Sequence, residues 1–167
     1  KWLCAPKGTS FLYVKKEHQT WVRPLIYSWG KDGDDPGPSE FLQDFQWQGT
    51  RDMAAFLTLP KVIQFFQEHI EGKRLSCKKL IRKTGAELAR LFNTPPIYAS
   101  PDWIHQMVSH PLPVNAPEDI KERLWAVYKI EIPVFQWCGQ RYIRVSCNVY
   151  NTDQQVEYFL NALRSLI

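Results

Sequence analysis

The sequence lacks several features that would assign it directly to a functional class. No apolar stretch approaches the roughly 20 residues of a membrane-spanning helix, so no membrane partner is expected. The four cysteines show no C-x-x-C pair or metal-like spacing and are interpreted as reduced thiols of a cytoplasmic protein. The motif H-E-x-x-H is absent, which favours structural roles for the histidines, and without G-x-S-x-G a serine hydrolase has no support.

Composition sets broad limits on what remains. A chain of 167 residues is long enough for one domain or for parts of two, and 44% hydrophobic residues is typical of globular proteins. The 14% of aromatic residues either fill a core or mark a surface that packs on something else. A net charge of +4 is too small to indicate nucleic-acid binding by itself.

The local patterns predict an α/β organisation in two parts. In residues 1–72 we expect strands at 9–15 and 23–29, then a helix from the N-cap Thr50 to Gly72 with a kink at Pro60. The Asp-rich loop at 30–38 lacks the spacing of an EF-hand, so calcium is disfavoured.

Residues 73–167 form the second part, a small α/β domain. The basic residues within 73–83 could form a patch that binds nucleic acid. However, Arg74, Lys78 and Arg82 share one side of a predicted helix, which favours a helix face exposed to solvent. The predicted elements are a helix at 73–92 eased or broken at Gly85, a strand at 103–110, a helix at 117–127, antiparallel strands at 130–137 and 141–149, and a helix to residue 167 capped by Thr152.

Three short runs carry the most specific signal: KWLCAPKGTSFLY (1–13), FQWQGTRD (45–52) and YIRVS (142–146). Together they resemble the class V aminotransferase family of pyridoxal-phosphate (PLP) enzymes, and within it the isopenicillin N epimerase branch. The resemblance implies the C-terminal portion of a PLP-dependent transferase fold. Residues 1–72 would then end the large PLP-binding domain, including an interface loop, and residues 73–167 would be the small domain.

The same resemblance implies the site residues. Lys1 would form the Schiff base with PLP and then act as base or acid at the substrate Cα, a role that needs a desolvated, neutral amine. Gly49 and Thr50 would bind the PLP phosphate of the other subunit of a homodimer, with Trp47 and Arg51 near the interface. Arg144 would clamp the substrate carboxylate, since its planar fork can make two parallel hydrogen bonds.

The predicted protein is therefore a PLP-dependent enzyme that acts on an amino acid or amino-acid-like molecule as an epimerase, lyase or aminotransferase. The chain begins at Lys1 without Met, so we expect a portion that is inactive alone, because half of the cofactor pocket would lie upstream. A non-catalytic α/β interaction module remains an alternative. So does cysteine desulfurase-like sulfur transfer, although nothing around Cys4 indicates the mobile loop that such a thiol needs.

Overall fold

The computed structural model describes residues 1–31, 38–46 and 48–167. The chain divides into two compact units, Lys1–Phe66 (unit 1) and Gln67–Ile167 (unit 2). Residues 32–37 of the Asp-rich loop and Trp47 lie outside the described residues. The division into a large-domain end at 1–72 and a small domain at 73–167 stays a prediction.

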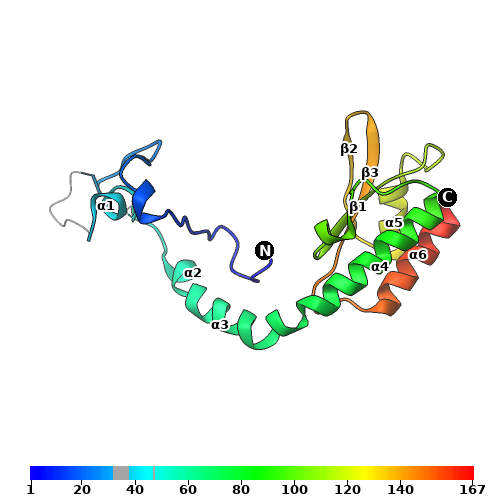
Figure 1. The fold of residues 1–167 in the computed structure, drawn as a ribbon, viewed down its shortest axis with the longest axis horizontal. Helices are drawn as coiled ribbons and strands as arrows, with labels where there is room; N and C mark the ends of the chain where they lie inside the picture. Colours follow the sequence, from blue (N-terminus) through cyan, green and yellow to red (C-terminus); the bar gives the residue numbers. More distant parts are fainter. Residues whose placement is uncertain (32–37, 47) are drawn as a thin grey trace. The chain divides into compact units, whose positions relative to one another are not determined.

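Unit 1 consists of short helices joined by irregular segments (Figure 1). The strands predicted at 9–15 and 23–29 are wrong, because neither segment has a partner with which to form a ladder in the described part of the chain. Phe41 and Asp44 are the buried residues among those described in this unit. Its elements are the 3₁₀ helix η1 (Lys16–His18) and the α-helices α1 (Glu40–Gln46), α2 (Ala54–Leu57) and α3 (Leu59–His69), the last of which runs past the unit boundary.

The helix predicted from Thr50 begins later than expected. Met53 is the N-cap of α2, and the Asp52 carboxylate accepts a hydrogen bond from the Ala54 N–H at 2.8 Å. Pro60 does not kink a continuous helix. It lies in the first turn of α3, where a missing N–H costs nothing because first-turn donors have no intrahelical partner.

The sheet of unit 2 has three antiparallel strands in the order β1-β3-β2. They are β1 (Met107–Pro111), β2 (Val134–Trp137) and β3 (Gln140–Ser146), so the predicted hairpin is confirmed. Its two-residue turn places Cys138 at φ 47° and Gly139 at φ 76°. Two successive positive φ angles match the right-handed twist of the strands that the turn joins.

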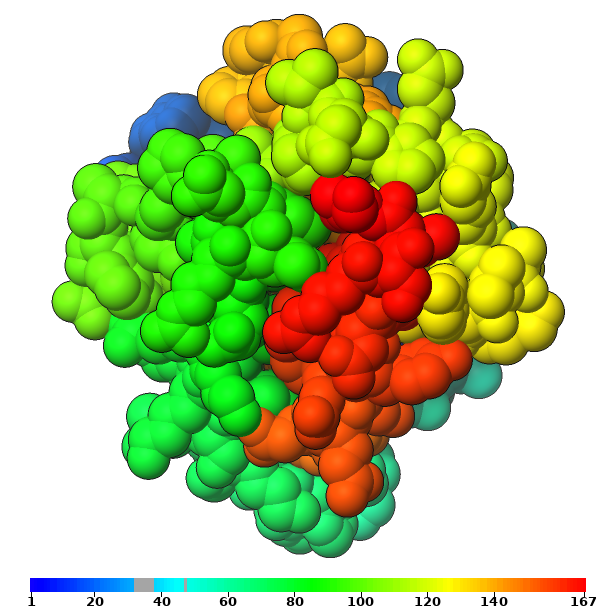
Figure 2. Space-filling model, turned by 90° about the vertical axis from the view of Figure 1, so that its right-hand side faces the viewer, coloured from blue at the N-terminus to red at the C-terminus, as the bar shows by residue number. Residues whose placement is uncertain are grey.

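Three helices cover one face of this sheet: α4 (Arg74–Phe92), α5 (Ile120–Tyr128) and α6 (Asp153–Leu166). Figure 2 shows α4 (green) and α6 (orange to red) side by side, with α5 (yellow) against α6. Ile143 and Val145 of β3 join the helices in one buried cluster. Two 3₁₀ turns, η2 (Glu71–Lys73) and η3 (Pro101–Trp103), complete the unit.

Two sequence signals in these helices had different outcomes. The Thr152 cap is confirmed, because its hydroxyl accepts from the Gln155 N–H at 3.2 Å while Gln155 accepts from the Thr152 N–H at 3.1 Å. The break expected at Gly85 is wrong, since α4 is continuous there. A Cβ at Gly85 would lie 3.2 Å from Val108 Cγ2, so this glycine permits close packing of α4 on β1. The mixed α/β fold class is confirmed by helices packed on an antiparallel sheet.

Candidate functional site

Arg144 lies on the face of the sheet opposite the helices. It belongs to the central strand β3, and its strand neighbours Ile143 and Val145 point into the core, so alternation directs Arg144 to the open face. Ser109 of β1 pairs with Arg144 in the register and therefore shares this face. The backbone N–H of Arg144 donates to Pro133 O at 3.0 Å, which fixes the position of the residue.

Two arginines of β3 have opposite environments. The guanidinium of Arg141 donates to the carbonyl oxygens of Ala116 and Pro117, so it ties the hairpin to the turn before α5. The guanidinium of Arg144 makes no hydrogen bond or ion pair with any described residue, and its Nε is buried without a partner. A buried donor without a partner costs free energy, and a cationic fork in this state fits a carboxylate ligand.

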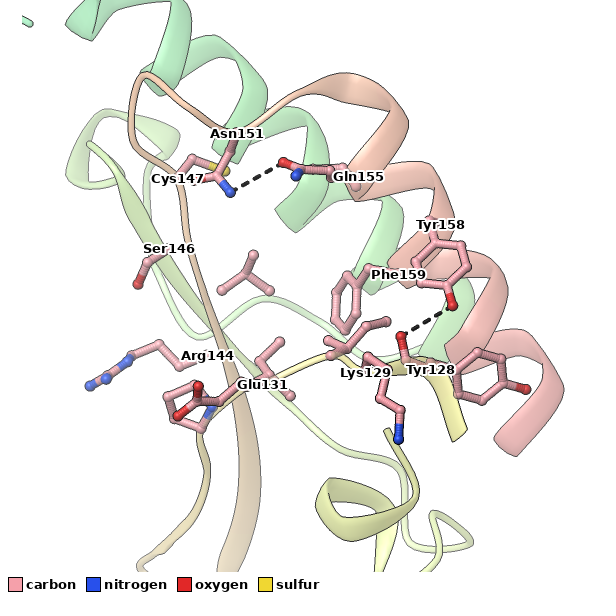
Figure 3. Close-up of a pocket in the computed structure, with 15 residues that line it drawn as sticks. Tyr128, Lys129, Glu131, Arg144, Ser146, Cys147, Asn151, Gln155, Tyr158 and Phe159 are labelled. Atoms are coloured by element: carbon pink, nitrogen blue, oxygen red, sulfur yellow. Dashed lines mark hydrogen bonds between the residues drawn. The ribbon is translucent and has the colours of Figure 1, made fainter. Parts of the chain in front are cut away.

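A pocket of about 420 Å³ lies beside Arg144, between the segment before β2 and the start of α6 (Figure 3). Its polar side chains at the α6 end are already paired: Tyr158 donates to Tyr128 O at 3.1 Å, and Asn151 donates to Gln155 at 3.4 Å. In Figure 3 the guanidinium of Arg144 points away from these groups. The unpaired positive charge is therefore at the open sheet face.

Cys147 also lines this pocket, and its environment bears on the sulfur-transfer alternative. Burial raises the pKa of its thiol to about 11, with a smaller contribution from Cys77. At neutral pH the thiol is protonated, and the thiolate is the form that attacks sulfur. Cys147 is therefore unsuited to carry a persulfide. All four cysteines are free, and Cys4 and Cys138 are exposed.

The other predicted site residues lie in unit 1. Lys1 is exposed, and its carbonyl accepts a hydrogen bond from the Cys4 N–H at 2.9 Å, closing a turn that holds Cys4 at φ 59°. Gly49 has φ 97°, a conformation that glycine adopts readily, and Thr50 is exposed. Thr50 is not at a helix N-terminus, so the sequence-based argument from a helix dipole does not apply to it.

The structure brings only some of these residues together. Gly49 and Thr50 are adjacent, but no hydrogen bond or ion pair between described residues joins them to Lys1. Lys1, Gly49 and Thr50 belong to unit 1, whereas Arg144 belongs to unit 2. These residues do suit PLP chemically. The primary amine of Lys1 can hold an aldehyde, and the backbone N–H of Gly49 together with the Thr50 hydroxyl can bind a phosphate.

An aromatic group lies beside Arg144 and was not predicted from the sequence. Phe135, Trp137 and Tyr142 lie on the same open face, because Phe135 pairs with Tyr142 in the register and the positions alternate. The rings of Phe135 and Tyr142 are stacked with centroids 5.6 Å apart. The signal was present in the hairpin sequence, where Phe135 and Trp137 occupy alternate positions of one strand and Tyr142 lies on the other.

The basic side of α4 contacts protein groups within unit 2. Arg82 forms an ion pair with Asp102 at 2.8 Å, and this guanidinium lowers the pKa of the Asp102 carboxyl. Arg74 donates to Gln106 at 3.4 Å. In the described ranges no helix is long and apolar enough to cross a membrane, and no group of three metal-ligating side chains occurs.

Comparisons with known proteins place these observations in a family. The chain is 30% identical to isopenicillin N epimerase of Amycolatopsis lactamdurans across 99% of its own length, and it covers 45% of that protein. It is 25% identical across 100% of its length to a probable chloroplastic L-cysteine desulfhydrase of Arabidopsis thaliana, covering 38% of it. The chain thus spans less than half the length of these curated relatives. No family model matches it.

A solved NifS-like protein has the same fold, with a TM-score of 0.52 at 21% identity over 86% of this chain and 38% of that one. At this sequence identity the likeness shows a shared fold. In sequence, the chain is similar to isopenicillin N epimerases and cysteine desulfhydrases, which are class V aminotransferase-like proteins. The resemblance predicted from the three short runs is confirmed.

Proposed function

We propose that this chain is part of a PLP-dependent enzyme that acts at Cα of an amino acid or amino-acid-like substrate, as an epimerase, a lyase or a class V aminotransferase. The observation that carries the proposal is the unpaired Arg144 guanidinium on the open face of β3. The likeness of 99% of the chain to isopenicillin N epimerase supports it. Because the relatives are more than twice as long, the proposal includes that residues 1–167 alone do not turn over substrate.

Arg144 is proposed to bind the substrate's α-carboxylate. Two parallel N–H···O bonds from one planar fork fix both the position and the rotation of the carboxylate, and Cα follows because it is bonded directly to it. A strand position suits this role, because the backbone of Arg144 is held by Pro133 on the β2 side and by the ladder to β1. Such positioning supplies several kcal/mol of a barrier reduction.

Lys1 is proposed to hold the cofactor through Nζ and, once released, to move the proton at the substrate Cα. PLP, when bound, takes up the electron pair that remains at Cα. A lysine acts as a base only when its amine is neutral, and removal from water favours the neutral form. Lys1 is exposed among the described residues, so the proposal requires further protein around it.

Gly49 and Thr50 are proposed to bind the cofactor phosphate of a second subunit, which makes a homodimer part of the proposal. The exposed Thr50 hydroxyl makes no hydrogen bond to a described residue, and the left-handed backbone at Gly49 leaves open space where a side chain would be. A phosphate can approach the backbone at such a position. Four free thiols also fit a reducing compartment such as the cytoplasm, which we include in the proposal.

The test is covalent trapping in the whole protein that carries this chain. The protein is loaded with PLP, reduced with borohydride and digested, and the labelled peptide is mapped by mass spectrometry. We expect the label on Nζ of Lys1, lost in Lys1→Arg and kept in Lys7→Arg, a matched lysine six positions away. Label on another lysine, or no label, contradicts the proposal. Unchanged activity in Lys1→Ala would instead favour a non-catalytic interaction module.

A further inference from the structure

The open face of the sheet carries three clustered aromatic rings next to Arg144. Tyr142 lies between Phe135, with ring centroids 5.6 Å apart, and Trp137, with centroids 6.2 Å apart. We call Phe135, Trp137 and Tyr142 the aromatic pad. Tyr142 is only 7% exposed, whereas Trp137 is 63% exposed and Phe135 39% exposed. The pad therefore presents two ring surfaces to solvent on a rigid hairpin.

The pad and Arg144 are spaced to contact one small molecule. Tyr142 and Arg144 are two residues apart on β3, so their side chains leave the same face with Cα atoms roughly 7 Å apart. A ligand that places its carboxylate on Arg144 therefore brings a side chain at its Cα within reach of the pad. The register puts nine residues on this face, and none of them is acidic: Met107, Ser109, Pro111, Phe135, Trp137, Gln140, Tyr142, Arg144 and Ser146.

We propose that the substrate whose carboxylate Arg144 binds carries an aromatic side chain, which packs on the exposed rings of Phe135 and Trp137. The inference rests on the proposed function, because it takes Arg144 as the carboxylate anchor. Charge complementarity supports this occupant: the face offers one unpaired cation and apolar rings, so it matches an anion with an apolar group.

The chemistry of the pad disfavours the other substrate types. An acidic side chain placed on the rings would lose water without gaining an ion-pair partner, since Arg144 already holds the carboxylate. A small side chain such as a methyl group would leave the rings in water. An aromatic ring gains both apolar burial and offset or edge-to-face contacts, which are worth about 0.5–1.5 kcal/mol beyond the buried area.

The experiment measures binding of ligands that cannot react with a cofactor. The whole protein is titrated, by calorimetry, with N-acetyl-L-phenylalanine, N-acetyl-L-alanine and N-acetyl-L-phenylalaninamide, which lacks the carboxylate. We expect the phenylalanine acid to bind about tenfold more tightly than the alanine acid, and the amide to bind at least about tenfold more weakly than its acid.

Variants assign these differences to the residues. Trp137→Ala should reduce the preference for phenylalanine to within about twofold, and Trp137→Phe should restore most of it because a ring is kept. Arg144→Gln should weaken both acids about tenfold or more and leave the amide unchanged. Trp125→Ala is the matched control, because Trp125 is 57% exposed on α5 and does not belong to the open face, so its removal should change nothing.

The outcomes separate this inference from the proposed function. Equal affinity for the two acids, or a preference that survives Trp137→Ala, overturns the aromatic substrate while the carboxylate role of Arg144 stands. Binding of the acids that is insensitive to Arg144→Gln, or no binding of either acid, overturns the carboxylate anchor as well. Trapping at Lys1 is measured without these ligands, so it reports on the cofactor role independently.

Discussion

Unit 2 buries its apolar side chains in one continuous cluster, whereas unit 1 leaves most of its own in solvent. Ile81, Leu88 and Leu124 are fully buried in unit 2, but Leu25 and Trp29 of unit 1 are 104% and 85% exposed. Tryptophan does not follow this division, since Trp103, Trp125 and Trp137 of unit 2 are also exposed. A core needs facing elements and not only apolar residues.

The largest expected effect is a direct test of this contrast. Leu88→Ala should lower the free energy of unfolding by about 2–5 kcal/mol, because it leaves a cavity in the core of unit 2. Leu25→Ala removes the same atoms from an exposed position and should change stability by less than about 0.5 kcal/mol. Urea unfolding followed by circular dichroism measures both. Similar losses in the two variants would show that unit 1 has a core of its own.

A smaller effect separates two threonines that the sequence predicts to be helix caps. Thr152→Ala should cost about 1 kcal/mol, because it removes the hydroxyl that accepts from Gln155 N–H at the start of α6. Thr50→Ala should cost less than about 0.5 kcal/mol, because α2 begins at Ala54 and Met53 is its cap. Urea unfolding followed by circular dichroism measures the loss of stability in both variants. A loss at Thr50 as large as at Thr152 would place a helix start at Thr50 after all.

These two threonines also show how far the sequence could predict the fold. Thr152 comes before an apolar stripe of Val156, Phe159 and Leu163, and all three are buried as predicted. At Thr152 the cap residue and the apolar stripe predict the same helix, and the helix forms where they predict it. At Thr50 a cap residue stood before a stripe that is only partly buried, and the helix begins later, with Met53 as its N-cap. Local signals were reliable where a facing element covered the stripe.

The site was predictable to a different degree in each unit. Alternation along β3 was enough to place Arg144 opposite the core, since its neighbours Ile143 and Val145 are plainly apolar. Its lack of a partner was not predictable, because the partners of an arginine on β3 come from other segments, as the backbone carbonyls of residues 116–118 do for Arg141. Contacts between segments distant in sequence depend on tertiary packing, which one strand's pattern does not contain.

The smallest expected effect concerns a buried histidine, which has no counterpart in unit 1. His110 of β1 is fully buried; Nε2 lies 2.8 Å from the Thr94 hydroxyl, and Nδ1 has no partner among the described residues. Burial lowers the pKa of His110 below 6.5, because the charged imidazolium is poorly solvated in the core; a hydrogen bond with the backbone of Thr94 opposes this in part. The unfolded chain therefore takes up a proton at a higher pH than the folded chain does.

It follows that the contribution of neutral His110 is complete above about pH 6.5 and is lost as the pH falls from there through the lowered pKa of the folded state. Unfolding free energies measured in steps from neutral to mildly acidic pH should fall in the native protein and fall less steeply in His110→Gln. The matched control is His18→Gln, because His18 is exposed in unit 1 and its replacement should leave the slope unchanged. If the unfolding free energy depends on pH equally in the native protein and in His110→Gln, the core of unit 2 tolerates the imidazolium. That result would contradict the view that unit 2 has a core closed to charge.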